Sequence, residues 1–140
     1  MIFVSLTKAI PGLRVSLKNV QRIASYVCFN ENVKHAELSF VILGDRVMKA
    51  INKKFLRHDY VTDVITFPLE EKEVNAEIYI NARQLQRQAK EHKVSTKNEM
   101  TRLLVHGTLH ALGYDDTEPL NKKKMFAVQE RYVKRLSLKK

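Results

Sequence analysis

A strongly apolar segment over residues 99–112 limits the folding of this chain more than any other feature. Its spacing predicts a helix with Asn98 as the N-cap. The apolar side chains cover more of the helix surface than one exposed stripe requires: Met100, Leu103, Leu104, Leu109, Ala111 and Leu112. Other elements must surround such a helix, so we expect it to be the buried centre of the fold.

The rest of the chain predicts the elements that surround this helix. Runs of β-branched and aromatic residues predict strands over residues 2–6, 37–43, 63–69 and 76–81. Apolar residues at helical spacing predict helices over residues 17–27, 47–55, 82–92 and 119–136. The third and fourth strands are joined by an acidic turn and can pair as a hairpin. The predicted fold class is therefore α/β (α+β), a small mixed sheet with helices packed around it.

Length and composition bound the class of protein. The chain has 140 residues, 44% of them hydrophobic, and we expect one domain over residues 1–140. No apolar run approaches the roughly 18 residues that cross a bilayer, so no membrane association is expected. The N-terminal segment lacks the layout of a secretory signal, and the lone Cys28 cannot form an internal disulfide. These features predict a cytoplasmic protein.

The charge of the chain is positive and unevenly distributed. The formal net charge is +10, and residues 119–140 contain eight basic side chains against one acidic side chain. Binding to a phosphate backbone releases counterions, so this excess of positive charge favours a polyanionic partner such as RNA. Residues 58–80 and 103–118 are acidic instead. Clustered carboxylates more often hold cations or carry out acid–base chemistry than contact a polyanion.

Two histidines on the apolar helix are the sharpest signal of chemistry. His106 and His110 are four residues apart, so their side chains differ by only about 40° around a helix and can reach one ion. An alternative is two histidines that are satisfied separately. An unpaired polar ring on an apolar helix would be costly, which favours a metal site.

A carboxylate can complete this site from the loop that follows. Gly113 can end the helix and reverse the chain, which brings Asp115 or Asp116 back towards the two histidines. Two His and one carboxylate suit one zinc ion first, although iron(II), manganese and nickel accept similar ligands. The His spacing also occurs in zinc proteases, where a Glu after the first His is the general base. Gly107 occupies that position here, so this mechanism lacks its base.

Two separated motifs resemble the YbeY family of bacterial rRNA maturation factors, which are metal-dependent endoribonucleases. The first motif is the segment from His106 to Asp116. The second is Leu56-Arg57 followed by Thr62-Asp63-Val64-Ile65-Thr66-Phe67-Pro68, with Thr66 where the family usually has Ser. Their order and spacing match from about residue 35 to residue 117. The family pattern ends in Gly-Tyr-Asp-His, and its last His is the third metal ligand; this chain has Asp116 there.

The resemblance implies a set of roles for residues of this chain. His106, His110 and Asp116 would hold the metal, and Arg57 would be the catalytic residue that steadies the scissile phosphate. Independently of the resemblance, Asp63 follows Thr62 at the start of a strand and can cap a turn, and by the same logic Asp115 can brace the metal loop, so both are expected to support the site. Alternatively, Arg57 forms a surface ion pair with Asp59, and Asp116 faces solvent.

The resemblance also implies an activity and partners. The activity is hydrolysis of single-stranded RNA during 16S rRNA maturation and ribosome quality control, with rRNA precursors and the small ribosomal subunit as partners. We expect no nucleotide cofactor. Two other functions stay open: a non-catalytic ribosome-assembly factor with a structural metal, and a metallohydrolase that acts on a small anion. The second is weaker because a small substrate does not require basic charge at both termini.

Overall fold

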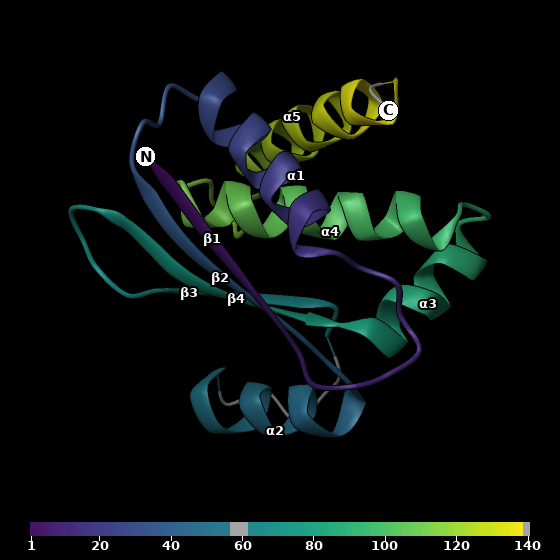
Figure 1. The fold of residues 1–140 in the computed structure, drawn as a ribbon. Coiled ribbons are helices and arrows are strands. Elements are labelled where there is room, and N and C mark those ends of the chain that lie inside the picture. Colours follow the sequence, from purple (N-terminus) through teal and green to yellow (C-terminus); the bar gives the residue numbers. More distant parts are fainter. Residues whose placement is uncertain (57–61, 139–140) are drawn as a thin grey trace.

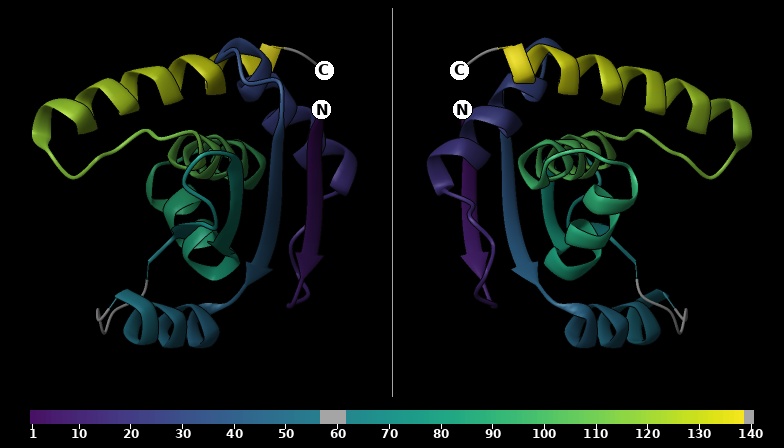
Figure 2. Two further views of the ribbon diagram at one scale, coloured as in Figure 1. Left: turned by 90° about the vertical axis from the view of Figure 1, so that its left-hand side faces the viewer. Right: turned by 90° about the vertical axis from the view of Figure 1, so that its right-hand side faces the viewer.

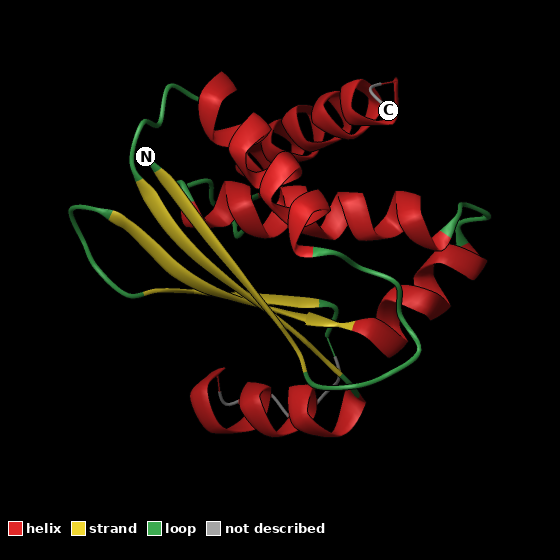
Figure 3. Cartoon of the chain, in the orientation of Figure 1, coloured by secondary structure: helices red, strands yellow, loops and turns green. Residues whose placement is uncertain are grey.

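The computed structural model describes residues 1–56 and 62–138, in which a four-stranded sheet lies between helical layers (Figures 1 and 3). The strands are β1 (Ile2–Lys8), β2 (Ala36–Leu43), β3 (Val64–Pro68) and β4 (Val74–Asn81). The helices are α1 (Leu17–Asn30), α2 (Asp45–Leu56), α3 (Ala82–Glu91), α4 (Thr96–Ala111) and α5 (Pro119–Leu138). The predicted α/β class, with a mixed sheet and the two histidines on a helix, is confirmed.

The sheet has the strand order β1-β2-β4-β3. β2 pairs in parallel with β1 and β4, whereas β3 and β4 form the predicted antiparallel hairpin, with Thr66 opposite Ile78. β4 begins at Val74 rather than at the predicted residue 76, because it pairs with β2 along its whole length. Side chains of β4 alternate as predicted: Ile78 and Ile80 are fully buried, while Glu77 and Tyr79 are only partly buried.

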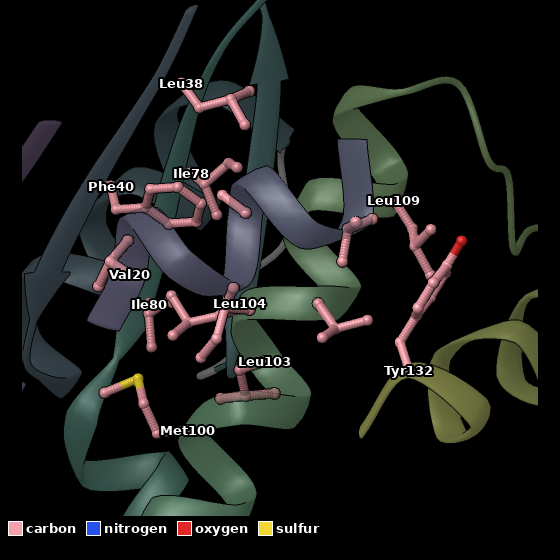
Figure 4. Close-up of a cluster of buried hydrophobic side chains, with 14 of the residues drawn as sticks. Val20, Leu38, Phe40, Ile78, Ile80, Met100, Leu103, Leu104, Leu109 and Tyr132 are labelled. Atoms are coloured by element: carbon pink, nitrogen blue, oxygen red, sulfur yellow. The ribbon is translucent and has the colours of Figure 1, made fainter. Parts of the chain in front are cut away.

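Helices cover the two faces of the sheet unequally. α1 and α4 pack on one face with α5 outside them, and α2 lies across the opposite face (Figures 1 and 2). The main core lies between the sheet and α4, where Phe40, Ile78 and Ile80 face Leu104 (Figure 4). A smaller cluster under α2 contains Leu43, Met48 and Ile65. Within the part of the chain that the structure describes, no helix combines the length and the apolarity that a membrane span requires.

The central helix α4 is buried as predicted but begins three residues earlier than predicted. Ser95 is the N-cap, and its side-chain oxygen accepts a hydrogen bond from the Asn98 N–H at 2.9 Å. The prediction that Asn98 caps the helix is therefore wrong. The Asn98 side chain lies within the first turn, where its oxygen accepts from Arg102 at 2.9 Å. Both residue types cap helices, and local sequence does not separate them.

Gly107 lets α4 approach the sheet closely. A Cβ atom at this position would lie 2.5 Å from Cγ2 of Ile78 on β4, so no side chain fits. The Thr66 hydroxyl on β3 also donates to the Gly107 carbonyl at 3.3 Å. This close contact fixes the flanking helix face relative to the sheet. It also explains in steric terms why the Glu of a zinc protease cannot stand here.

Candidate metal centre

The α4 helix places His106 and His110 on one face, one turn apart. Their Nε2 atoms are 3.1 Å apart, and their rings meet edge to face at an angle of 78°. Both side chains are about three-quarters buried, with exposed fractions of 25% and 23%. The Nε2 atoms of both imidazoles are therefore directed towards one common position.

The loop after α4 returns a carboxylate to this point. Gly113 adopts a positive φ of 105°, and the Tyr114 N–H donates back to the Leu109 carbonyl at 3.0 Å. Asp116 then lies with Oδ2 at 3.3 Å from His110 Nε2 and 3.7 Å from His106 Nε2. The structure thus brings together the three residues that the sequence suggested as metal ligands.

Hydrogen bonds behind the two rings fix their orientation. His110 Nδ1 donates to the Tyr114 carbonyl at 2.9 Å, and His106 Nδ1 contacts Gln129 Oε1 at 2.6 Å. The Gln129 amide donates from Nε2 to Glu130 at 3.0 Å, which leaves its oxygen to accept from His106. Each Nδ1 atom therefore carries a hydrogen. In the neutral rings both Nε2 atoms are then lone-pair acceptors directed into the site.

The three facing atoms fit a divalent cation. With both rings neutral and protonated at Nδ1, two imidazole lone pairs and a carboxylate oxygen converge. This arrangement is repulsive unless a cation lies among the three atoms. Tetrahedral zinc with ligand bonds of about 2.0–2.2 Å separates its ligand atoms by about 3.3–3.6 Å. The observed separations of 3.1, 3.3 and 3.7 Å bracket that range. The residues His106, His110 and Asp116 could therefore hold a metal ion.

The surroundings of His106 favour its neutral imidazole form. Burial lowers the pKa of His106 below its ordinary value, against the opposing effects of the Gln129 hydrogen bond and the nearby carboxylates. A proton on Nε2 would compete with a metal for the same lone pair. A lowered pKa of His106 therefore keeps this ligand atom available at neutral pH.

The other predicted site residues lie around this centre. Asp63 accepts from its neighbouring Val64 N–H at 2.8 Å and from Gln88 at 3.2 Å, and it lines the same cleft as His106. Asp115 is exposed and accepts from both the N–H and the hydroxyl of Thr117, and these hydrogen bonds lower its pKa. Arg57 and its alternative partner Asp59 lie outside the described residues.

Sequence reasoning missed a polar network behind the metal centre. Glu99 is only 2% exposed, and Arg102 pairs with it and with Glu130 at 2.8 Å each. Glu130 accepts from Gln129, which in turn holds His106. Two charged residues inside the apolar 99–112 segment, Glu99 and Arg102 at i,i+3 spacing, were the signal in the sequence. Their further partners, Gln88 on α3 and Glu130 on α5, are distant in the chain, and local spacing does not identify them.

A cleft of about 780 Å³ opens beside the metal centre. His106 and Asp116 lie in its lining with Asp63, and side chains of α5 form a further wall. That wall belongs to the first turns of α5, which extend beyond the helical layer after the loop at residues 112–118 (Figure 2). The cleft gives a ligand larger than water access to His106 and Asp116.

Comparison with known proteins places the chain in a family. The family model described as endoribonuclease YbeY matches residues 12–137. The chain belongs to the YbeY endoribonuclease family. A relative named endoribonuclease YbeY, from Chlorobium phaeovibrioides, is 35% identical over 91% of this chain and 83% of its own length. A YbeY relative with the same name, from Endomicrobium trichonymphae, is 34% identical over 79% of each chain.

The fold agrees with this family assignment. The solution structure of a Thermotoga maritima protein matches with a TM-score of 0.67 and 28% sequence identity. The match covers 95% of this chain and 87% of the other. The resemblance that the two sequence motifs indicated is confirmed by the family model over residues 12–137, and this solved structure shares the fold.

Proposed function

We propose that the chain is a metal-dependent, single-strand-specific endoribonuclease, with one zinc ion held by His106, His110 and Asp116. The observation that carries the proposal is the convergence of two imidazole Nε2 atoms and a carboxylate oxygen, 3.1 to 3.7 Å apart, at the side of a cleft. Membership of a family whose relatives are named endoribonucleases supplies the reaction class. Other divalent ions accept the same ligands and compete for the site.

Different residues of the chain have different roles in the proposed hydrolysis of RNA. Gln129 and Tyr114 hold the two imidazoles in the orientation that a ligand requires. Lys122 and Lys123 line the cleft and attract the phosphate backbone. A bound divalent ion supplies Lewis-acid stabilisation of the negative charge that develops on the phosphodiester.

Further roles follow from the family resemblance. Arg57 steadies the scissile phosphate through a bidentate contact, as the matching family position implies. Asp63 and Asp115 support the site, which agrees with their hydrogen bonds to backbone N–H groups. The substrates are precursors of ribosomal RNA, processed on or near the small ribosomal subunit in the cytoplasm.

The test is cleavage of an end-labelled single-stranded RNA by the zinc-loaded protein. His110→Ala and a chelator-treated sample run beside it, with His35→Ala as a matched control because His35 is exposed and lies outside the cleft lining. We expect cleavage by the wild type and His35→Ala and none in the other two samples. Asp116→His, which restores the family ligand, should retain cleavage.

Two other results would redirect the proposal. Equal cleavage in all samples would indicate a contaminating nuclease. Absence of cleavage, together with a zinc-dependent gain in thermal stability and intact RNA binding, would favour the assembly factor with a structural metal. That outcome would leave the ligand assignment in place and remove the catalytic role.

A further inference from the structure

Phe126 is a large aromatic residue whose side chain is exposed to solvent. It lies on α5 and is 60% exposed, although the next residue on one side, Met125, is buried at 1% exposure. The helix could bury an aromatic ring at this point only by rotating. The fold therefore holds Phe126 outside the core while anchoring its neighbour within it.

The exposed ring faces the catalytic cleft. Phe126 lines the same cleft as His106 and Asp116. It lies three residues before Gln129 on α5, a rise of about 5 Å along the helix axis. Gln129 is the residue that hydrogen-bonds His106 at 2.6 Å. The ring is consequently about one helical turn from the residue that holds the metal centre in place.

Two lysines flank this ring on α5, while the carboxylates of the cleft lining, Asp63, Glu99 and Asp116, come from other segments. Lys122 and Lys123 lie four and three residues before Phe126 on the same helix, and both are exposed in the cleft lining. An aromatic ring among cationic side chains is the combination that binds single-stranded nucleic acid, because bases stack on the ring while cations hold the backbone.

We propose that Phe126 is a stacking platform for one nucleobase of a single-stranded RNA, next to the phosphate that is cleaved. The proposal rests on the proposed function and deepens it. Lys122 and Lys123 hold the phosphates that flank the stacked base. The ring selects unpaired RNA, because a base within a duplex is already stacked on its neighbours and does not present a free face.

The platform predicts low base specificity. Every base has a π-face, so a stack on Phe126 tolerates sequence changes in the RNA. It requires only that a base be present at one position relative to the cleaved bond. An RNA with an abasic site at that position should lose the stacking contact while it keeps every phosphate of its backbone.

The experiment compares protein variants against RNAs with a single abasic site. Binding of a labelled single-stranded RNA to zinc-loaded protein is measured by fluorescence anisotropy, with RNA integrity checked on a gel, and cleavage is timed separately. The variants are Phe126→Ala, Phe126→Tyr and Phe29→Ala. Phe29 is a matched control because it is 80% exposed on α1 and is not among the described residues that line the cleft.

Loss of one base–aromatic stack predicts that Phe126→Ala weakens binding about 5- to 150-fold. Phe126→Tyr and Phe29→Ala should bind as the wild type does. An abasic site at one position should weaken binding to the wild type by the same factor. That abasic site should not weaken binding to Phe126→Ala further, since the contact is already absent.

Each contrary result has a separate meaning. The platform would be overturned if Phe126→Ala bound RNA with the affinity of the wild type, or if the abasic site weakened binding equally to Phe126→Ala and to the wild type. Cleavage by the wild type would still uphold the nuclease in that case. The expected binding pattern without any cleavage would uphold the platform and overturn the nuclease. Failure of the wild type to bind single-stranded RNA would overturn both.

Discussion

At the scale of single residues, the candidate metal centre depends on the hydrogen bonds behind its two imidazoles. The Gln129 oxygen accepts from His106 at 2.6 Å and so determines which ring nitrogen faces Asp116. The network of Glu99, Arg102 and Glu130 holds the Gln129 amide in turn. Such outer partners contribute to metal affinity because they fix the tautomer and the orientation of the ligand.

Gln129 can therefore be tested separately from the ligands. We expect Gln129→Ala to weaken zinc binding about 10- to 100-fold, while Gln129→Glu, which keeps an acceptor, retains most of the affinity. Competition with a chromogenic chelator measures both. Gln21→Ala is a matched control on the exposed side of α1. Equal zinc affinity in Gln129→Ala and wild type would contradict a positioning role for this amide.

Gly107 is a second residue whose identity the packing dictates. Gly107→Ala would place Cβ 2.5 Å from Ile78 Cγ2, and we expect it to lower the free energy of unfolding by about 1–3 kcal/mol. Urea denaturation measures this loss. Because Ile78→Ala removes the clashing methyl group, Gly107→Ala should cost less in that background. Equal costs in both backgrounds would show that the clash is not the cause.

At the scale of elements, Glu31 joins three segments that are far apart in the sequence. It lies at the end of α1 and accepts hydrogen bonds from Tyr114, in the loop after α4, at 2.6 Å and from Tyr132 on α5. Hydrogen bonding to Glu31 raises the pKa of Tyr114, and burial with the same carboxylate raises the pKa of Tyr132. The loop that bears Asp116 is thereby tied to two helices.

Replacing this carboxylate by an amide removes one acceptor. In Glu31→Gln the amide oxygen can accept from one tyrosine, but the amide nitrogen cannot accept from the other. We expect the free energy of unfolding to fall by about 1–3 kcal/mol, measured by urea denaturation. Glu37→Gln on β2 is the exposed control and should change stability little. A loss no larger than that of the control would contradict the proposed link.

A second link between elements depends on pH. Arg87 on α3 forms two hydrogen bonds to Asp45 at the start of α2, at 2.7 and 2.9 Å, and this contact lowers the pKa of Asp45 from 3.8 to about 2. A carboxylate whose pKa is lower in the folded state than in the unfolded chain stabilises the folded protein. This stabilisation is fully present at pH values above the pKa in the unfolded chain. That contribution disappears as the pH falls from about 4 to 2.

Asp45→Asn should show this pH dependence directly. The two side chains are 40% and 51% exposed, so we expect a loss of less than about 1 kcal/mol at pH 7. The difference in unfolding free energy between wild type and Asp45→Asn should shrink towards zero near pH 2. Urea denaturation at a series of pH values measures it. A difference that stays constant from pH 7 to pH 2.5 would contradict the ion pair as its source.

The same elements show how far sequence reasoning reaches. Apolar spacing predicted α4 and placed His106 and His110 on one face, because both follow from the local period of a helix. Alternation predicted the β3–β4 hairpin for the same reason. Gln129 and Glu31 were not predicted, since their partners are 23 or more residues away in the chain. The N-cap of α4 was assigned wrongly because Ser95 and Asn98 are both competent caps.

At the scale of the whole molecule, lysines lie on both sides of the sheet. The cleft is lined largely by α4 and α5 on one side, whereas α2 lies across the opposite face (Figure 1). Lys122 and Lys123 line the cleft, while Lys53 is exposed on α2. The net charge of +10 favours RNA through long-range attraction, and the proposed stacking platform assigns direct contacts with the strand to the cations in the cleft.

Salt dependence distinguishes these two kinds of charge. Each phosphate contact with single-stranded RNA contributes about 0.7 to the slope of log affinity against log salt concentration. We expect the double variant Lys122→Ala/Lys123→Ala to reduce that slope by about 1.4, measured by anisotropy titrations between 50 and 200 mM salt, the range over which phosphate contacts dominate affinity. Lys53→Ala changes the net charge but removes no contact, so its slope should match the wild type. If each lysine reduced the salt slope equally in the cleft and on α2, RNA affinity would depend on the overall charge of the molecule. That result would contradict binding of the RNA strand in the cleft.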